Sequence, residues 1–201
     1  MIQTWLADVT PLLNREIYRK YYNELPMKRK EKADKLQQIA DKALSVGTWI
    51  LYERAKLNNP EVVAYNLSHS GKYGLCSIAI NEQTEVKVGC DIEKIGATQG
   101  ALAKRFFTGS ESEYVTGAEK FYRMWVLKES FAKATGEGLK VGMANFEVSF
   151  DDSDKPKINL KPERFGQKYF LKEYSMQGAD YKIAVCATSD EFAKTLEVVR
   201  L

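Results

Sequence analysis

The chain of 201 residues has one histidine, three cysteines and no long apolar run. A single histidine argues against zinc sites built from histidine and cysteine. The three thiols show no paired spacing and stand in apolar, strand-like contexts, so we expect buried free cysteines in a reducing compartment. Because no run approaches the ~20 apolar residues of a membrane helix, we expect no membrane association.

The net charge and the segment Met1–Asp8 argue against two further classes, nucleic-acid-binding and secreted proteins. The segment Met1–Asp8 lacks a basic region followed by a long apolar stretch, so we expect no secretory signal and a cytoplasmic location. A net charge of +3 allows an anionic substrate, but the chain has no dense basic stripe, and we expect no nucleic-acid partner. With 44% hydrophobic and 28% charged residues, it is typical of one globular domain or two small lobes sharing a core.

Hydrophobic periodicity predicts helices and mostly antiparallel strands in mixed order, hence an α+β fold. Strand patterns cover residues 1–8, 62–67, 73–80, 86–92, 146–150, 157–160, 169–174 and 181–187. Helix patterns cover residues 36–57, 101–107, 111–115 and 118–135, and Thr10-Pro11 predicts an earlier helix start. Expected core positions of the two earliest helices are Leu12, Leu13, Ile17, Tyr21, Ile39, Ala43, Val46, Ile50 and Leu51. Residues 96–100 are expected to form a loop.

Two carboxylates stand close together in the strand pattern at residues 86–92. Asp91 and Glu93 are two residues apart, so on a strand both point to the same face of a sheet. Taken alone, this pattern favours a solvated strand edge. The apolar neighbours, however, make one face of the segment a core face, which indicates that both carboxylates are held on a well-positioned strand.

A second group of charges lies in the helix pattern at residues 118–135. Trp125, Glu129 and Lys133 follow at intervals of four and share one side of the helix. The Glu–Lys spacing is also that of an ordinary stabilising helix pair, worth about 0.2–0.5 kcal/mol, and that interpretation suffices for the pair alone. Trp125 and Phe131 indicate a substantially buried helix, where unpaired charges are costly and a functional reason for them gains weight.

If the strand and helix faces meet, three carboxylates converge beside one ammonium group. Two bare carboxylates about 4 Å apart repel by roughly 4 kcal/mol at an effective dielectric near 20, so such a cluster needs a cation. A hard cation with oxygen ligands and room for phosphate oxygens is the natural candidate, which means Mg²⁺.

Two further segments are rich in groups that bind phosphate. Asn66–Gly71 is predicted as a turn and holds His69 between Ser68 and Ser70, although a lone histidine in a turn is more often structural or exposed. A basic cluster follows Pro26 and is interpreted either as a solvated helix start or as a clamp for a terminal phosphate. This cluster consists of Lys28, Arg29, Lys30 and Lys32.

Taken in order, these features resemble the 4′-phosphopantetheinyl transferase superfamily, specifically its larger single-chain, surfactin-type branch. The resemblance extends from about residue 26 to residue 140, and five motifs in the correct order make it specific. The motifs are Pro26-x-Lys-Arg-x-Glu-Lys32, Asn66-Leu-Ser-His-Ser-Gly71, Val88-Gly-Cys-Asp-Ile-Glu-Lys94, Lys104-Arg-Phe-Phe107 and Trp125-x-x-Lys-Glu-Ser-x-x-Lys133.

The resemblance implies transfer of the phosphopantetheine arm of coenzyme A to a serine hydroxyl of an acyl- or peptidyl-carrier protein, with release of adenosine 3′,5′-bisphosphate. Asp91, Glu93 and Glu129 would hold Mg²⁺, so that Asp91 and Glu129 count among the catalytic residues. Lys133 would neutralise the departing phosphate, and Glu129 would be the base that takes the serine proton, directly or through water.

It also implies where coenzyme A binds. Ser68 and His69 match positions that contact its phosphates, and Lys28, Arg29 and Lys32 match the region near its 3′-phosphate. Arg105, Phe106 and Phe107 would either face the acidic helix of a carrier protein or, for the two phenylalanines, lie in the core.

The fold implied by the resemblance is a pseudo-dimer of two similar α+β lobes with the active site between them. We expect residues 1–95 to form the lobe with the basic cluster, the Ser-His segment and the Asp-x-Glu strand. Residues 96–201 would form the lobe with the Trp125–Lys133 helix and a closing sheet. The branch is usually monomeric, and we expect a monomer.

Two alternatives remain open at this point. Many members carry a Gly-Lys-Pro segment before the Asn-Leu-Ser-His-Ser motif, whereas Leu57–Tyr65 has no lysine. This difference motivates a non-catalytic relative that binds coenzyme A or a carrier protein. Because acidic clusters are generic, an unrelated Mg²⁺-dependent phosphohydrolase is the other alternative.

Overall fold

The computed structural model describes residues 1–81, 85–97 and 99–201 of the chain. Thr98, in the expected loop at 96–100, lies outside the described residues. The helices are α1 (Arg15–Glu24), α2 (Met27–Asp34), α3 (Ile39–Asn58), α4 (Gly100–Phe106), α5 (Gly109–Tyr114) and α6 (Ala118–Ala134). The strands are β1 (Ile2–Asp8), β2 (Val62–Ser70), β3 (Tyr73–Ile80), β4 (Val88–Lys94), β5 (Glu147–Phe150), β6 (Pro156–Leu160), β7 (Phe170–Tyr174), β8 (Tyr181–Ala187) and β9 (Glu197–Arg200).

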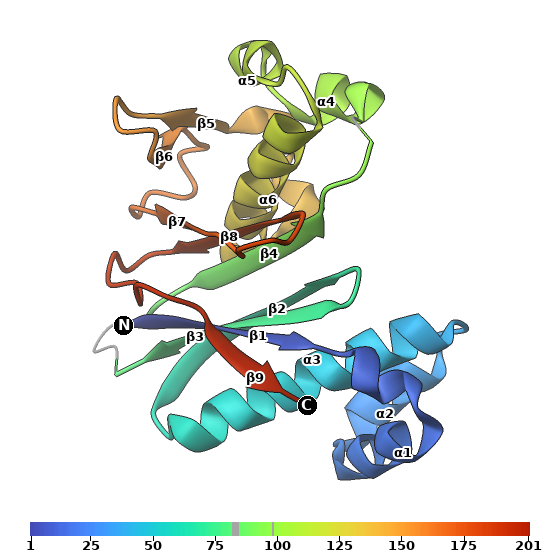
Figure 1. Ribbon diagram of the computed structural model, residues 1–201. Helices are drawn as coiled ribbons and strands as arrows, with labels where there is room; N and C mark the ends of the chain where they lie inside the picture. Colours follow the sequence, from blue (N-terminus) through green and yellow to red (C-terminus); the bar gives the residue numbers. More distant parts are fainter. Residues whose placement is uncertain (82–84, 98) are drawn as a thin grey trace.

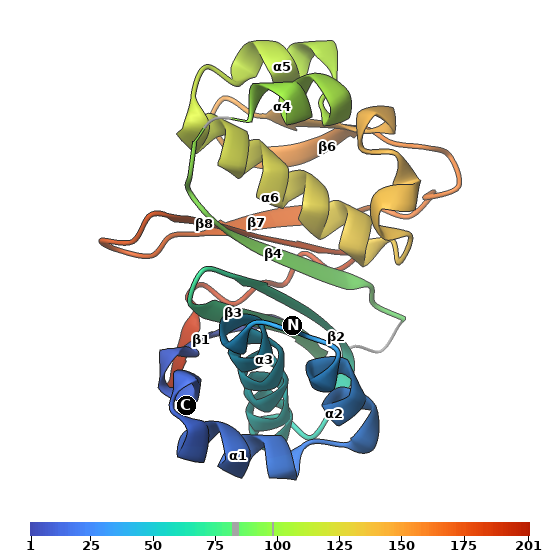
Figure 2. The same ribbon diagram turned by 90° about the vertical axis from the view of Figure 1, so that its right-hand side faces the viewer.

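These elements form an α+β fold with small sheets packed against helices (Figures 1 and 2). One sheet has the strand order β2-β3-β1-β9, a second has the order β4-β8-β7, and β5 pairs with β6. The first two sheets are stacked, α3 covers the outer face of the first, and α6 covers the outer face of the second (Figure 2). Within the described residues, no helix combines the length and apolar character needed to cross a membrane.

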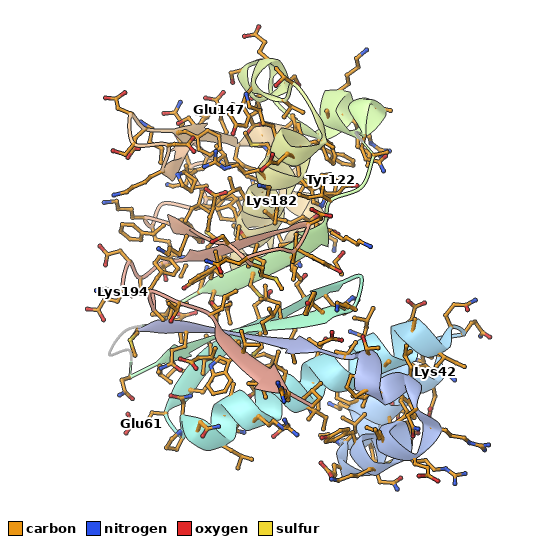
Figure 3. All side chains as sticks on the ribbon, in the orientation of Figure 1. Lys42, Glu61, Tyr122, Glu147, Lys182 and Lys194 are labelled. Atoms are coloured by element: carbon orange, nitrogen blue, oxygen red, sulfur yellow. The ribbon has the colours of Figure 1, made fainter. Side chains whose placement is uncertain are left out.

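The two stacked sheets are held together by an apolar core. Ile2, Leu6 and Leu75 of the first sheet pack with Ile92 and Val185 of the second, and all five side chains are buried. Side chains fill the space between the layers throughout (Figure 3). Since apolar burial stabilises by about 25 cal/mol per Å², this interior fixes how the sheets lie on each other.

The predicted strands, and all the predicted helices except the first, are confirmed, with bounds that differ by up to three residues. The prediction of the first helix is wrong. The expected helix after Thr10-Pro11 is a short 3-10 turn, η1 (Thr10–Leu13), and α1 starts afresh at Arg15. Asn14 causes the break because its Oδ1 accepts hydrogen bonds from the backbone N–H groups of Glu16 and Ile17 and caps α1.

Three expected core positions are therefore on the surface. Leu13 is 51% exposed and Ile17 37% exposed, since the break at Asn14 rotates them out of the expected apolar stripe. Ile39 is 67% exposed because it occupies the first position of α3, before the helix reaches the sheet.

Two errors concern strands. The predicted strand at 62–67 is confirmed but extends further: residues 68–70, expected as part of the turn at Asn66–Gly71, continue β2 and pair with β3, so the chain reverses only after Ser70. The sequence pattern also missed β9, which pairs in parallel with β1 through the register Trp5 to Glu197. Four residues at a sheet edge, most of them exposed, carry too little hydrophobic alternation to be recognised.

A buried ion pair fixes α6 against α5 and β5. Lys128 Nζ donates to both carboxylate oxygens of Glu111 at 2.7 Å and to the Phe146 carbonyl at 2.8 Å. Glu111 also accepts from the Val148 N–H at 2.8 Å, and both charged side chains are fully buried. Removing either partner would leave a buried charge uncompensated, so this pair holds the rotation of α6 about its axis.

On its other side α6 approaches β4 closely at Gly89. A Cβ atom at Gly89 would lie 2.1 Å from the Ser130 carbonyl oxygen and 2.3 Å from the Ala134 nitrogen. Both contacts are backbone atoms of α6, which cannot move aside separately. Only glycine therefore allows the helix to lie this close to the strand.

We predict that Gly89→Ala destabilises the protein by at least the 1–3 kcal/mol typical of overpacking, because helix and strand must separate. Thermal unfolding should show a lower Tm by about 2–4 °C per kcal/mol. Gly109→Ala is the control, since a Cβ at Gly109 meets no described atom within 4 Å. Equal Tm values for the two variants would contradict this account of the packing.

Candidate active site

A cavity of about 590 Å³ lies where α6, β4 and β2 meet, and it reaches α2 and α3. Its lining is strongly polar and combines both signs of charge. The lining residues are Arg29, Lys32, Ser45, Thr48, Tyr65, Asn66, Leu67, Ser68, His69, Asp91, Glu93, Trp125, Glu129 and Lys133.

The cavity gathers most of the site residues expected from the sequence, although they come from four separate segments. Those that line it are Arg29, Lys32, Ser68, His69, Asp91, Glu93, Glu129 and Lys133. Lys28 is different: it is exposed, one helical turn before Lys32, and does not belong to the lining. The strand face of Asp91 and Glu93 and the helix face of Glu129 and Lys133 meet in this cavity, which was the condition for a carboxylate cluster.

Lys133 joins the three elements at the cavity. Its Nζ donates to Asp91 Oδ1 at 2.7 Å, to Ser68 Oγ at 3.0 Å and to the Cys90 carbonyl at 3.1 Å. Ser68 Oγ in turn donates to Asp91 Oδ1 at 2.8 Å. The ammonium has three N–H donors, and all three are engaged. Lys133 therefore pairs with β4 rather than forming the ordinary helix pair with Glu129 that its spacing allowed.

Asp91 is buried but only half satisfied. Its Oδ1 accepts from Lys133 and Ser68, whereas its Oδ2 is buried without a hydrogen-bond partner. Burial raises the pKa of Asp91 even though the Lys133 charge acts to lower it. Burial alone would lower the pKa of Lys133, but attraction by Asp91 raises it overall, so the ammonium stays charged.

The other ionisable groups of the cavity are also perturbed. Burial raises the pKa of Glu129, and the negative charges of Asp91 and Glu93 raise it further. Burial likewise raises the pKa of Glu93. The pKa of His69 is lowered, first by desolvation at the cavity wall and then by the charge of Lys133.

We tested whether these groups suit Mg²⁺. Among the described residues, no three or more His, Cys, Asp or Glu side chains are arranged so that they could hold a metal ion. Mg²⁺ does not need such a cage, since it keeps several waters and binds one or two carboxylates together with substrate phosphates. The unpartnered Oδ2 of Asp91, next to two carboxyl groups with raised pKa values, fits a small hard cation.

Several lining residues were given no role in the sequence interpretation, among them four with polar side chains. Ser45 and Thr48 bring hydroxyl groups from α3, and Thr48 Oγ1 is buried without a partner. Tyr65 and Asn66 come from β2. Two hydroxyl residues three positions apart within an apolar helix would have been a usable signal for one polar face.

An aromatic group supports the cationic end of the cavity. The Arg29 guanidinium lies 3.8 Å from the centre of the Trp49 ring. Tyr65 stacks on Tyr52 with ring centres 4.1 Å apart, and Trp49 contacts both rings. Cation–π contact limits the conformations of Arg29, so its charge is held at the cavity.

Comparison with known proteins assigns the family. The model of the 4′-phosphopantetheinyl transferase superfamily matches residues 87–186, which include β4 and α6. The 4′-phosphopantetheinyl transferase Sfp of Bacillus subtilis (strain 168) is 33% identical over 141 residues, which cover 67% of this chain and 59% of that protein. The chain belongs to the 4′-phosphopantetheinyl transferase superfamily.

Other superfamily members show the extent of the similarity. The 4′-phosphopantetheinyl transferase psf-1 of Bacillus pumilus is 29% identical over 141 residues, 67% of this chain and 57% of that protein. The chain thus spans less than two thirds of the length of these curated relatives. The solved holo-[acyl-carrier-protein] synthase of Helicobacter pylori in complex with coenzyme A covers 49% of this chain and 96% of its own, with 21% identity and a TM-score of 0.43.

The raised pKa of Glu129 gives a stability prediction. Its folded-state pKa lies above the ordinary value of 4.5, so stability falls as the pH rises above about 4.5, and the full cost is present once the pH exceeds the raised pKa. We expect Glu129→Gln to raise the Tm at pH 7, by about 2–4 °C per kcal/mol recovered. The gain should shrink as the pH falls towards 4, where both states carry a neutral carboxyl group.

Unfolding curves at pH 7 and pH 4, without divalent cations, measure this effect. Glu113→Gln is the control because Glu113 is exposed on α5. A Tm for Glu129→Gln that is unchanged or lower at pH 7 would contradict the assignment of an unfavourable buried charge.

Proposed function

We propose that the protein transfers the 4′-phosphopantetheine arm of coenzyme A to a serine hydroxyl of an acyl- or peptidyl-carrier protein and releases adenosine 3′,5′-bisphosphate. One observation carries the proposal. Three acidic residues, Lys133 and the Ser68-His69 pair, all within the superfamily motifs, line one cavity together with Arg29 and Lys32 from α2. A long substrate with phosphates at two separate positions matches this distribution of charge.

Each end of the cavity then has a task. Arg29 and Lys32 would bind the 3′-phosphate of coenzyme A, for which a forked guanidinium and a point charge are both suited. Ser68 and His69 would contact the pyrophosphate. Lys28, assigned the same role from the sequence, lies outside the lining, and we propose only a long-range contribution to the local potential.

At the reacting end, Asp91, Glu93 and Glu129 would hold Mg²⁺. When bound, this ion would draw negative charge from the pyrophosphate oxygens and orient them. Glu129 would accept the proton of the carrier serine, directly or through water, and its raised pKa suits a base better than an ordinary carboxylate. A positioned base contributes about 10²–10⁴-fold to the rate.

Lys133 would stabilise the negative charge that develops on the departing phosphate. All three of its N–H groups are already engaged with Asp91, Ser68 and the Cys90 carbonyl. To reach a phosphate oxygen, the ammonium must therefore exchange one of these bonds. Cation binding at Asp91 would favour that exchange because it weakens the hold of the carboxylate on Lys133.

The proposal includes the organisation expected from the resemblance. The chain would act as a monomer in the cytoplasm, with two similar lobes, residues 1–95 and 96–201, on either side of the site. The surface that would face the carrier protein consists of Arg105, which is exposed, and Phe106, which is partly exposed and packs on Trp125 with ring centres 5.6 Å apart. Phe107 is buried, in keeping with a core position.

We predict that the protein, coenzyme A and Mg²⁺ add one phosphopantetheine group to the serine of an apo carrier protein, observed by mass spectrometry. Asp91→Asn should lower kcat by at least ~10²-fold, because it removes a charge that binds the cation and holds Lys133. The exposed turn residue Asp152 provides the control, Asp152→Asn.

The same assay separates the alternatives. Tight coenzyme A binding without transfer to any of several carriers would favour a non-catalytic relative. Release of inorganic phosphate from simple esters, with no carrier modification, would favour a phosphohydrolase. Either result would overturn the transferase proposal.

We also predict a selective effect at the cationic end. Lys32→Ala should raise the KM for coenzyme A about 10- to 100-fold. A hydrogen bond between charged groups contributes about 1.5–3 kcal/mol, and its loss corresponds to a change of this size. It should leave the KM for 3′-dephospho-coenzyme A nearly unchanged. Lys28→Ala, which lies outside the lining, should change both values little. A Lys32→Ala effect of equal size on both substrates would exclude 3′-phosphate recognition by Lys32.

A further inference from the structure

The strands β2 and β4 lie side by side but belong to different sheets, and side chains rather than a backbone ladder join them. Asn66 Oδ1 accepts from the Cys90 N–H at 3.1 Å, and Ser68 Oγ donates to Asp91 Oδ1 at 2.8 Å. One step further along β2, Ser70 Oγ donates to Glu93 Oε2 at 2.7 Å.

The spacing of these contacts is that of a strand face. Asn66, Ser68 and Ser70 are alternate residues of β2, so their side chains share one side. They follow β4 from Cys90 to Lys94, whose backbone N–H donates to Ser70 Oγ at 3.1 Å. Ser70 thus donates one bond and accepts another, which fixes its hydroxyl between the side chain and the backbone of β4.

Glu93 needs such a restraint. Asp91 and Glu93 are alternate residues of β4, so both carboxylates lie on one side of the strand and repel each other when ionised. A glutamate side chain has three rotatable bonds and would turn away from that repulsion. The hydrogen bond from Ser70 to Oε2 opposes this rotation and holds the carboxylate on the side of β4 that faces Asp91.

We propose that Ser70 is a positioning residue, which orients Glu93 beside Asp91 so that the two carboxylates can hold a divalent cation together. Ser70 does not line the cavity, so it acts through Glu93 and not by touching a substrate. The proposal rests on the proposed function only for the nature of the cation. Partners that orient metal ligands in this way typically contribute 10- to 100-fold to metal affinity.

The test compares Mn²⁺ binding by the unaltered protein and by Ser70→Ala, measured by electron paramagnetic resonance in the presence of coenzyme A. Mn²⁺ takes the oxygen ligands that suit Mg²⁺ and reports binding without turnover. Ser70→Ala should raise the Kd for Mn²⁺ about 10-fold or more, with little change in Tm or in the KM for coenzyme A. Ser70→Thr keeps the hydroxyl and should restore binding to within about threefold of the unaltered protein.

The chain offers a matched control. Ser110 Oγ donates to Glu147 Oε2 at 2.7 Å, the same contact at the same distance, and Glu147 lies near α5 at the far end of the molecule (Figure 3). Ser110→Ala should therefore leave Mn²⁺ binding unchanged. An equal Kd for Ser70→Ala and the unaltered protein, or equal losses in Ser70→Ala and Ser110→Ala, would overturn the proposal.

A parallel transfer assay separates this inference from the proposed function. Mn²⁺ binding that depends on Ser70, without transfer to any carrier, would support the positioning role and overturn the transferase. Transfer by an unaltered protein that binds no Mn²⁺ would support the transferase and overturn the positioning role of Ser70.

Discussion

The site depends on the position of one ammonium group. Lys133 comes from α6, and its three acceptors come from β4 and β2, so one side chain fixes the helix against both strands. That position requires the close approach of α6 to β4 at Gly89, and it requires the rotation of α6 that the buried Lys128–Glu111 pair maintains. The packing of α6 in the second half of the chain therefore determines where the charge of Lys133 lies in the cavity.

The cavity also concentrates charge that opposes folding. Burial raises the pKa values of Asp91, Glu93 and Glu129, which means that ionising them costs free energy in the folded state. Lys133 neutralises one of the three, and Asp91 Oδ2 is buried without a hydrogen-bond partner among the described residues. A fold with only 5–15 kcal/mol of stability keeps such a cluster at the expense of other contacts, as functional sites commonly do. A bound divalent cation would offset that cost.

The sequence predicted more of this site than of the local structure around it. Asp91 and Glu93 were placed on one strand face and Glu129 and Lys133 on one helix face, because periods of two and of about four residues are properties of short segments. What periodicity could not supply is the contact between segments: the partner of Lys133 is 42 residues away in Asp91. For the same reason β9 was missed, since its pairing with β1 is a long-range contact that its own four residues do not encode.

The error at Asn66–Gly71 is instructive because it concealed how two sheets are joined. Polar residues with glycine are typical of a turn, yet residues 66–70 are a strand whose polar side chains bond to the edge of another sheet. Edge strands expose backbone groups that need partners, and Asn66 supplies one to Cys90 where a ladder would otherwise be required. Joining two sheets through side chains leaves room between the edges. The polar side chains of Asn66 and Ser68 that make these contacts also line the cavity, so one strand face both joins the sheets and shapes the site.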